Sequence, residues 1–392
     1  MLNIGLVGKP NVGKSTLFSA LTSVSAEIGN YPFTTTKPNM GVSFFKTPCP
    51  HNEIGKQCSP REGRCINGIR YVPVEIIDVP GLIPGSSQGK GMGNEFMDNI
   101  REARSIIHVF DASGTTDADG NPIQEHRDPV EDIAQIEQEV VRWLGDRVFR
   151  DWDKFARKAD AGGERIERTL GRKIASFGIS ETDIVKILSS EFFPGKLSLW
   201  NLEDAIRFAS AILAKIKPVI RAGNKADRIL RQEADRISSV YPGTLFISGQ
   251  YELALEKAFN SGLIDSTRPD FSISEKATAK QIEALTKIKE FIGQTWVTRI
   301  SDLIGKVVRE MLRYIVVYPV YDESSWSDSQ GNILPDALLV PDGFTALNLA
   351  YRVHTEIGEG FIRAIDCRTH RAIGKDHVLK DRDVIRIVSK SR

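Results

Sequence analysis

The sequence predicts an α/β protein whose sheet carries helices on both faces, with a helical insertion and a small β-rich domain at the C-terminal end. Three observations predict this architecture. Apolar runs of strand length recur along the chain and end in glycine or polar residues. Between residues 128 and 217 strand signals vanish, and apolar residues recur at helical spacing. After residue 313 short strand-like runs return around a helix-like stretch.

Composition places the chain among soluble globular proteins. At 392 residues it is long enough for two or three domains. The net charge of +1 argues against overall attraction to polyanions but permits local basic patches. No apolar run reaches membrane-spanning length, and Met1 leads directly into the first strand, so we expect no signal peptide and no membrane partner. Four cysteines do not imply disulfide stapling, and we expect a cytoplasmic monomer.

The first apolar run, Leu2–Val7, opens into a glycine-rich turn that ends in Gly13-Lys14-Ser15 and leads into a helical pattern. This is the G-x-x-x-x-G-K-[ST] phosphate loop in its required strand–loop–helix context. Its backbone N–H groups can surround a polyphosphate, while Lys14 reaches the β/γ oxygens and Ser15 ligates Mg²⁺. The residues expected to contact the nucleotide here are Gly8, Lys9, Pro10, Asn11, Val12, Gly13, Lys14, Ser15 and Thr16.

A second strand-like run, residues 73–77, ends in Asp78-Val-Pro-Gly81. An aspartate at the end of a strand beside a phosphate loop can hold Mg²⁺, directly or through water. Gly81 can then offer its backbone N–H to a γ-phosphate. An Asp-x-x-Gly sequence is also common in ordinary turns, so this interpretation depends on its context.

Two later strand-like runs point to the base. The run at residues 218–223 is followed by Asn224-Lys225-Ala-Asp227, and the run at 244–248 ends in Ser248-Gly249. A carboxylate at Asp227 can accept the two N–H donors of a guanine edge, which adenine lacks. Asn224 and the Lys225 stem can support the base, and a backbone amide at Ser248-Gly249 can meet guanine O6. Because ligands of open α/β sheets bind beyond the carboxyl ends of the strands, GTP is the predicted nucleotide.

Together these motifs resemble the Obg family of P-loop GTPases. Residues 30–41 (Asn-Tyr-Pro-Phe-Thr-Thr-Thr-Lys-Pro-Asn-Met-Gly) resemble its first switch, and residues 78–85 and 106–113 extend the likeness to the YchF-related branch. The resemblance implies that Thr35 joins Ser15 and Asp78 on Mg²⁺, and that Lys14, Thr35 and Gly81 serve catalysis. ATP-preferring YchF members carry Asn-x-x-Glu at the base-reading position. Asp227 therefore groups this chain with the guanine readers, similar to archaeal relatives.

The hydrolytic machinery departs from the Ras-like pattern. Ras-like enzymes position the attacking water with a glutamine directly after the switch glycine, but this chain has Leu82 there. We therefore expect slow intrinsic turnover or help from a partner. Residues 81–95 are rich in glycine, which is typical of a segment that orders with the γ-phosphate.

Two further residues, Asn11 and His108, each have two possible roles. Asn11 resembles the asparagine with which potassium-stimulated relatives bind K⁺ beside the phosphates; the alternative is a loop-shaping asparagine. His108 aligns with a histidine proposed as catalytic in YchF-like proteins. Because it lies inside an apolar strand, we expect a packed, hydrogen-bonded histidine instead.

Three cysteines and a histidine occur within seventeen positions, among Gly, Pro and charged residues. Cys49, His51, Cys58 and Cys65 match the ligand types of a Cys₃His zinc site, but no Cys-x-x-Cys pair is present. The alternatives are a loop of free cysteines between adjacent strands and a redox-labile pair.

The rest of the chain predicts two attachments to a GTPase domain. The charged helices after residue 121 resemble the helical, often coiled-coil, insertion of the YchF branch, and the C-terminal pattern resembles a TGS domain, a ubiquitin-like β-grasp module. The expected boundaries are 1–120 and 218–312 for the GTPase domain with a helical extension, 121–217 for the insertion and 313–392 for TGS. In residues 363–392 Lys and Arg exceed Asp by five, which suits contact with a phosphate backbone.

The sequence thus favours a GTP-hydrolysing switch whose insertion and TGS domain engage ribosomes or other RNA-containing partners. The alternatives are a nucleotide-binding scaffold with negligible hydrolysis, ATP hydrolysis as in YchF relatives, and a small-molecule kinase. The predicted guanine contact at Asp227 argues against a small-molecule kinase. Leu82, which cannot orient water, is compatible with a scaffold that barely hydrolyses GTP.

Overall fold

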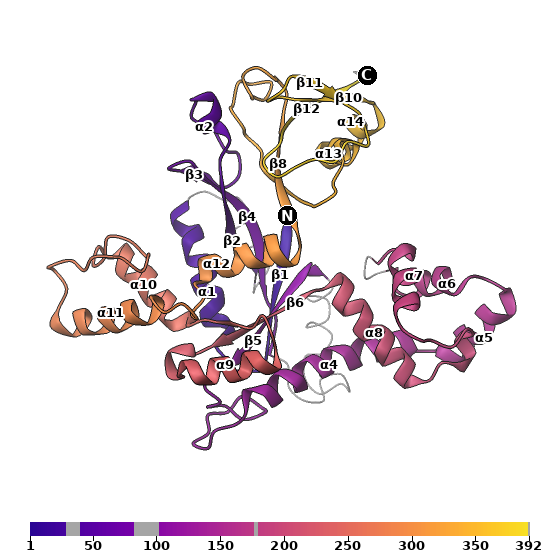
Figure 1. Ribbon diagram of the computed structural model, residues 1–392, viewed down its shortest axis with the longest axis horizontal. Coiled ribbons are helices and arrows are strands. Elements are labelled where there is room, and N and C mark those ends of the chain that lie inside the picture. Colours follow the sequence, from indigo (N-terminus) through magenta and orange to yellow (C-terminus); the bar gives the residue numbers. More distant parts are fainter. Residues whose placement is uncertain (29–39, 82–101, 176–178, 391–392) are drawn as a thin grey trace. The chain divides into compact units, whose positions relative to one another are not determined.

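The computed structural model describes residues 1–28, 40–81, 102–175 and 179–390 (Figure 1). The chain divides into two compact units, which we call the larger and the smaller unit. The larger unit comprises residues 3–20 and 76–300, and the smaller comprises 1–2, 21–75 and 301–392. Four elements pass from one unit to the other: β1 (Leu2–Val7), α1 (Lys14–Ile28), β4 (Ile69–Asp78) and α12 (Ile300–Gly305).

The larger unit is built on parallel strands. Its remaining elements are β5 (Ser105–Asp111), α4 (Pro129–Phe149), α5 (Trp152–Gly162), α6 (Ile166–Lys173), α7 (Glu181–Ser190), η3 (Leu197–Leu199), α8 (Leu202–Ile216), β6 (Val219–Asn224), η4 (Ala226–Arg228), α9 (Arg231–Val240), β7 (Leu245–Phe246), α10 (Gly249–Asn260) and α11 (Ala279–Ile292). Along the sheet the strands lie in the order β4, β1, β5, β6, β7. Apolar side chains suit strands that are covered on both faces of a parallel sheet. β5, for example, is buried along its whole length.

The register of these strands aligns their polar ends. β1 pairs in parallel with β5, and β5 pairs in parallel with β6 so that Asp111 lies opposite Asn224. The phosphate loop follows β1, and Asp78 ends β4. The strands that the sequence predicts here are therefore confirmed, and their carboxyl ends bring the predicted site residues to one edge of the sheet.

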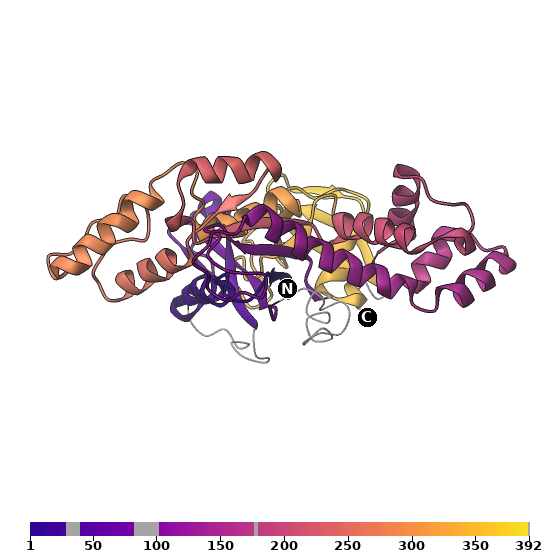
Figure 2. The same cartoon turned by 90° about the horizontal axis from the view of Figure 1, so that it is seen from below.

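The segment after β5 is helical, as its periodicity predicts. Asp128 caps α4, because its side chain accepts a hydrogen bond from the Val130 N–H, and Pro129 occupies the first turn. Asn201 begins α8 with a capping box that includes Asp204. α4 and α8 pack side by side, which Figure 2 shows from a second direction. Trp152, at the start of α5, and Trp200, just before α8, are both buried and stack with ring centroids 5.5 Å apart.

Helices α9, α10 and α11 close the other part of the larger unit. Their buried faces share one core with β5 and β7, in which Phe110, Phe246 and Leu255 are among the most buried side chains. This core fixes the ends of β6 and β7, where the predicted base-reading residues lie.

The smaller unit holds the second predicted β-rich region. Its elements are β2 (Met40–Pro48), α2 (His51–Ile54), β3 (Arg64–Ile66), α12 (Ile300–Gly305), the π-helical turn η5 (Lys306–Met311), β8 (Tyr314–Val320), β9 (Leu338–Pro341), α13 (Ala346–Val353), α14 (Thr355–Glu359), β10 (Phe361–Asp366), β11 (Arg371–Ile373) and β12 (Val384–Ser389). β3 and β4 form an antiparallel hairpin. The last five strands form a sheet in the order β11, β10, β12, β8, β9, with β12 parallel to β8. Leu349 of α13 packs on this sheet together with Val317 and Ile385.

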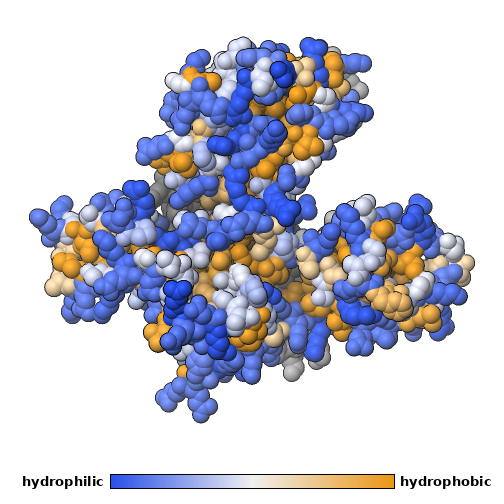
Figure 3. Space-filling model, in the orientation of Figure 1, coloured by the Kyte–Doolittle hydropathy of each residue, from blue (hydrophilic) through white to orange (hydrophobic). Residues whose placement is uncertain are grey.

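The fold is therefore the mixed α/β architecture that the sequence predicts. Among the described residues, no helix is long and apolar enough to cross a membrane. Hydrophilic side chains dominate the face drawn in Figure 3, with apolar side chains in smaller areas between them.

Candidate nucleotide site

The loop between β1 and α1 has the close backbone packing that a phosphate loop needs. A Cβ on Gly8 would lie 2.0 Å from the Val109 carbonyl oxygen. Gly13 has a φ of +92°, and a Cβ there would lie 2.3 Å from Asn224 Nδ2. Both positions therefore exclude a side chain. α1 begins at Lys14, so its first N–H groups face the loop as in other anion sites at helix starts.

Lys14 lies across this loop. Its Nζ donates hydrogen bonds to the carbonyl oxygens of Gly8, at 3.0 Å, and Lys9, at 2.9 Å. Burial lowers the pKa of Lys14 to about 8, against the opposing effect of the Asp78 carboxylate. An anion at the loop would favour the charged form of this lysine.

Ser15 and Asp78 meet beside Lys14. The Ser15 hydroxyl donates to Asp78 Oδ2 at 3.0 Å, whereas Asp78 Oδ1 is buried and has no hydrogen-bond partner among the described atoms. Burial raises the pKa of Asp78, and the Ser15 hydrogen bond and the Lys14 charge oppose that shift. A hydroxyl and an orphaned carboxylate oxygen are the donors that Mg²⁺ prefers, so these two residues fit the predicted ion. Thr35, the third predicted ligand, lies outside the described residues.

Gly81 lies against the phosphate loop. A Cβ on Gly81 would come within 2.9 Å of Pro10 Cγ, so only glycine fits without a shift of the loop. Gly120 packs on the same proline, since a Cβ there would lie 2.4 Å from the Pro10 carbonyl oxygen. Asn11 completes the contact by donating from Nδ2 to the Gly120 carbonyl at 2.9 Å. Leu82 and the glycine-rich segment to residue 95 lie outside the described residues.

Asn224 joins the phosphate end of the site to the base end. Its Nδ2 donates to the Val12 carbonyl at 2.8 Å, and its Oδ1 accepts from the Gly249 N–H at 2.9 Å. The backbone N–H of Gly249, which the sequence predicts to meet guanine O6, donates to Asn224 in this structure. Its contact with the base stays a prediction. Ser248 caps α10 by accepting from the Tyr251 N–H.

The two charged residues of the base-reading motif lie in different settings. Lys225 has a φ of +60°, and its Nζ forms an ion pair with Asp111 Oδ2 at 2.8 Å. Asp227 lies on η4 with its side chain 10% exposed, and its nearest basic group in an ion pair is Arg228, at 4.0 Å. The carboxylate of Asp227 is therefore shielded, and the described residues provide no closer ion-pair partner, so its contact with a guanine base stays a prediction.

Sequence reasoning missed two carboxylates that organise the site. Asp111 is fully buried and accepts hydrogen bonds from Ser113, Thr115 and Thr116 in addition to Lys225. The signal was present, since Asp111 ends a strand and is followed by hydroxyl residues. Lys9, predicted to contact the nucleotide, instead directs its Nζ to the Thr116 carbonyl and to Asp132 of α4. This leaves the backbone of Lys9, and not its side chain, for phosphate.

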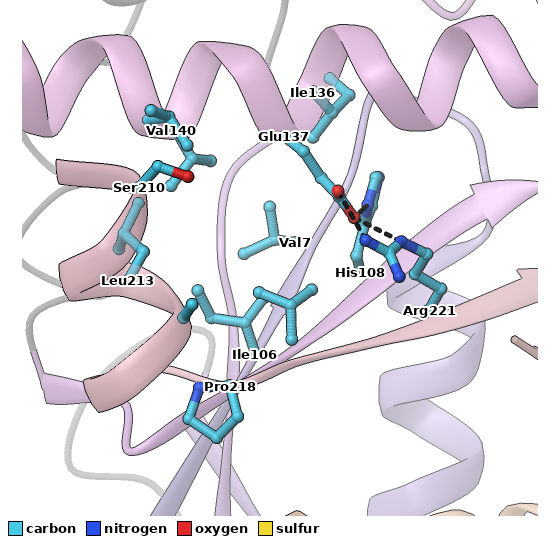
Figure 4. Close-up of a pocket in the computed structure, with 13 residues that line it drawn as sticks. Val7, Ile106, His108, Ile136, Glu137, Val140, Ser210, Leu213, Pro218 and Arg221 are labelled. Atoms are coloured by element: carbon cyan, nitrogen blue, oxygen red, sulfur yellow. Dashed lines mark hydrogen bonds and ion pairs between the residues drawn. The ribbon is translucent and has the colours of Figure 1, made fainter. Parts of the chain in front are cut away.

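His108 has the packed setting that its strand position predicts. It is 2% exposed, and its Nδ1 lies 3.5 Å from Glu137 Oε1. Glu137 also pairs with Arg221 at 2.7 and 2.8 Å. Burial opposes the charge on Glu137, but hydrogen bonds from His108 and Arg221 lower its pKa to about 2. These three residues lie at one end of a mostly apolar cavity of about 420 Å³ between the sheet and helices α4 and α8 (Figure 4).

The four residues of the predicted metal site come together in the smaller unit. The ligand atoms of Cys49, His51, Cys58 and Cys65 all lie within 4.8 Å of one another. The cysteines are free thiols. We refer to these four residues as the cysteine–histidine cluster.

Three family models match the chain. The model for "50S ribosome-binding GTPase" matches residues 3–145, and "Obg-like GTPase YGR210-like, G4 motif-containing domain" matches residues 222–322. The model for the TGS domain matches residues 330–389.

Comparisons with individual proteins agree with these models. The uncharacterized GTP-binding protein MJ1332 of Methanocaldococcus jannaschii is 44% identical, with 100% of both chains covered. The crystal structure of a GTP-binding protein from Pyrococcus horikoshii is 32% identical and superposes with a TM-score of 0.79, covering 99% of this chain and 100% of that one. The ribosome-binding ATPase YchF of Mycoplasma genitalium is 37% identical over 59% of this chain and 58% of its own. The chain therefore belongs to the Obg-like, YchF-related family of GTP-binding P-loop GTPases and carries a C-terminal TGS domain.

Proposed function

We propose that this protein is a slow GTPase that acts as a molecular switch for a ribosome or another RNA-containing partner. The observation that carries the switch is the Asn224 bridge, because it couples the phosphate loop at Val12 to the base loop at Gly249. The shielded Asp227 carboxylate beyond β6 supports guanine over adenine, and so argues against the ATP preference of YchF relatives.

In this proposal the chain positions phosphate more than it performs chemistry. Lys14 and the loop amides hold the β/γ oxygens, Ser15 and Asp78 hold Mg²⁺ together with Thr35, and the Gly81 N–H meets the γ-phosphate. The metal neutralises charge on the transferred phosphoryl group. No side chain at residue 82 orients water, because leucine has no polar atom, which supports slow intrinsic turnover.

K⁺ is the proposed auxiliary ion. The hydrogen bond to Gly120 uses Asn11 Nδ2 and so orients the side chain while leaving its Oδ1 outside that bond. A carbonyl-type oxygen beside the phosphates is the ligand that a monovalent cation needs. Such an ion would supply transition-state charge that is otherwise provided by an arginine finger.

The proposed partner surfaces are the α4–α8 insertion and the basic end of the TGS domain. The sequence relatives include proteins named for ribosome binding, and one matching family model is described as a 50S ribosome-binding GTPase. Between residues 363 and 390 the Lys and Arg side chains that lie exposed are Arg363, Arg371, Lys375, Lys380, Arg382 and Lys390. Exposed cations of this kind suit RNA phosphates. Such a partner places the protein in the cytoplasm, where we expect it to act as a monomer.

The test combines binding and turnover on purified ribosomes. We expect more protein to co-sediment in the GTP-analogue state than in the GDP state, and single-turnover GTP hydrolysis to accelerate about tenfold or more with ribosomes and K⁺. Asn11→Gly should remove the K⁺ effect alone, since glycine tolerates the φ of +59° at this position. Equal binding in both states together with unaccelerated hydrolysis would instead establish a scaffold.

Lys14 predicts a proton linkage to nucleotide binding. Its pKa of about 8 leaves it mostly neutral above that pH, and bound phosphates favour the charged form. Binding at about pH 8.5 should therefore take up about three quarters of a proton, and affinity should fall as pH rises through 8. Calorimetry in two buffers of different ionisation enthalpy measures this uptake. Lys14→Arg, which stays charged, should abolish it, and buffer-independent heats for the wild type would contradict the prediction.

A further inference from the structure

The cysteine–histidine cluster has the dimensions of a metal site. Cys49 Sγ and Cys58 Sγ lie 3.8 Å apart, and Cys65 Sγ lies 3.5 Å from His51 Nδ1. A tetrahedral zinc ion with its usual bond lengths places two sulfur ligands about 3.8 Å apart, and a sulfur and a nitrogen about 3.6 Å apart. The observed distances therefore match two edges of that tetrahedron. A disulfide would need the sulfurs at about 2.05 Å.

Local structure explains how widely spaced residues form this cluster. Cys49 follows β2 directly and is held by its N–H, which donates to the Gly68 carbonyl at 2.8 Å. His51 begins the short helix α2, and Cys65 lies in β3, which turns back onto β4. Cys49, His51 and Cys58 are 3%, 7% and 5% exposed. Because four protein ligands surround the centre, the arrangement is that of a closed structural site and not of a catalytic one.

The surroundings of the cluster favour a negative charge. Arg70 is fully buried, forms no ion pair with a carboxylate in the described part of the chain, and donates to Cys58 Sγ at 3.8 Å. Two of the three buried side-chain atoms without a partner in the described residues are Arg70 Nε and Tyr318 Oη. A buried guanidinium without a counter-ion is costly. Zn²⁺ with three thiolates and a neutral imidazole carries one negative charge, which would supply that counter-ion.

The same arginine connects the cluster to the C-terminal domain. Arg70 donates to the Leu334 carbonyl at 3.0 Å and to the Pro335 carbonyl at 2.8 Å. Two backbone hydrogen bonds run alongside, from Ser59 N to the Ile333 carbonyl at 2.8 Å and from Arg61 N to the Pro335 carbonyl at 2.9 Å. The loop that carries Cys58 is thus fastened to the segment that precedes β9.

We propose that Cys49, His51, Cys58 and Cys65 bind one structural zinc ion, which holds this loop in place for the segment before β9. The ion would fix Cys58 and Cys65 relative to β4, and so fix the donors at Ser59, Arg61 and Arg70. Metal binding would therefore stabilise the attachment of the TGS domain. This site is independent of the nucleotide site, because none of its residues belongs to the phosphate or base loops.

The first test measures the metal content of the full-length protein after it has been reduced and supplied with equimolar zinc. We expect one zinc per chain after gel filtration, and Co²⁺ in its place should give the visible bands of a tetrahedral site with thiolate-to-metal charge transfer. Cys65→Ser should lose the zinc, whereas the same change at Cys367, a buried thiol outside the cluster, should retain it. Absence of bound zinc in the reduced wild type, or octahedral Co²⁺ spectra, would overturn the proposal. A stable Cys49–Cys58 disulfide that blocks zinc uptake would also overturn it.

The second test measures the attachment itself and uses only the wild-type protein. Chelation of zinc from the wild type should accelerate hydrogen exchange of the Ser59 and Arg61 amides about tenfold or more, while buried amides of β10 change little. Unchanged exchange at both amides after complete zinc removal would overturn the stabilising role. Both tests are made without nucleotide, so their outcome is separate from that of the proposed switch.

Discussion

Replacement of Asp227 by asparagine is expected to weaken GTP binding about 100-fold or more and to make xanthosine triphosphate the preferred ligand. The carboxylate accepts two N–H groups of guanine, and hydrogen bonds to a charged group contribute about 1.5–3 kcal/mol each. An asparagine presents an N–H₂ toward a guanine N–H, but the same N–H₂ meets the carbonyl at the corresponding position of xanthine. The asparagine Oδ1 can still accept the other guanine N–H, but without a charge. One lost and one weakened hydrogen bond amount to about two powers of ten or more in affinity.

Competition against a fluorescent guanine nucleotide measures this change. Asp235→Asn on α9 is the matched control, since that carboxylate is 66% exposed and should leave both affinities unchanged. Undiminished GTP affinity in Asp227→Asn, or no gain for the xanthine nucleotide, would show that another group reads the base.

Replacement of Gly13 by alanine is expected to remove most nucleotide binding and to destabilise the larger unit by about 3–7 kcal/mol. The strained φ of +92° accounts for about 1 kcal/mol of this loss. The rest arises because the new Cβ would lie 2.3 Å from Asn224 Nδ2. Asn224 must then leave the Val12 carbonyl and the Gly249 N–H, and each unpaired buried group costs about 1–3 kcal/mol.

Gly163→Ala separates strain from collision. Gly163 also has a positive φ, +66°, but a Cβ there would meet nothing within 4 Å. It should lose only about 1 kcal/mol in thermal or urea unfolding and bind GTP normally. If the two variants lost equal stability and Gly13→Ala still bound GTP, the Asn224 bridge would have no part in the site.

Local signals explain what the sequence could predict. The phosphate loop, the β4 end at Asp78 and the base motif after β6 each consist of neighbouring residues whose conformation depends on an adjoining strand. Because parallel strands align their carboxyl ends, predicting the strands was enough to bring these residues together. The helical insertion was also predictable from a local signal, because α4 carries its apolar residues at helical spacing.

Long-range polar pairs explain what it could not. The Lys9–Asp132 and Arg70–Leu334 contacts join residues more than one hundred positions apart. No periodicity links such partners, because the pairing depends on how whole elements pack. The cysteine–histidine cluster was recognised only in outline, since its ligands come from a strand end, a one-turn helix, a loop and a hairpin. The residue types could indicate a metal site, but they could not give the distances between the four side chains.

The Lys9–Asp132 ion pair connects the helical insertion directly to the phosphate loop. Lys9 lies within the phosphate loop, and Asp132 lies in the first turn of α4, with both side chains 3% exposed. Breaking a buried ion pair is expensive, so a force that bends α4 is transmitted to the loop before the pair separates. A displacement of α4 is therefore expected to change the conformation of the phosphate loop.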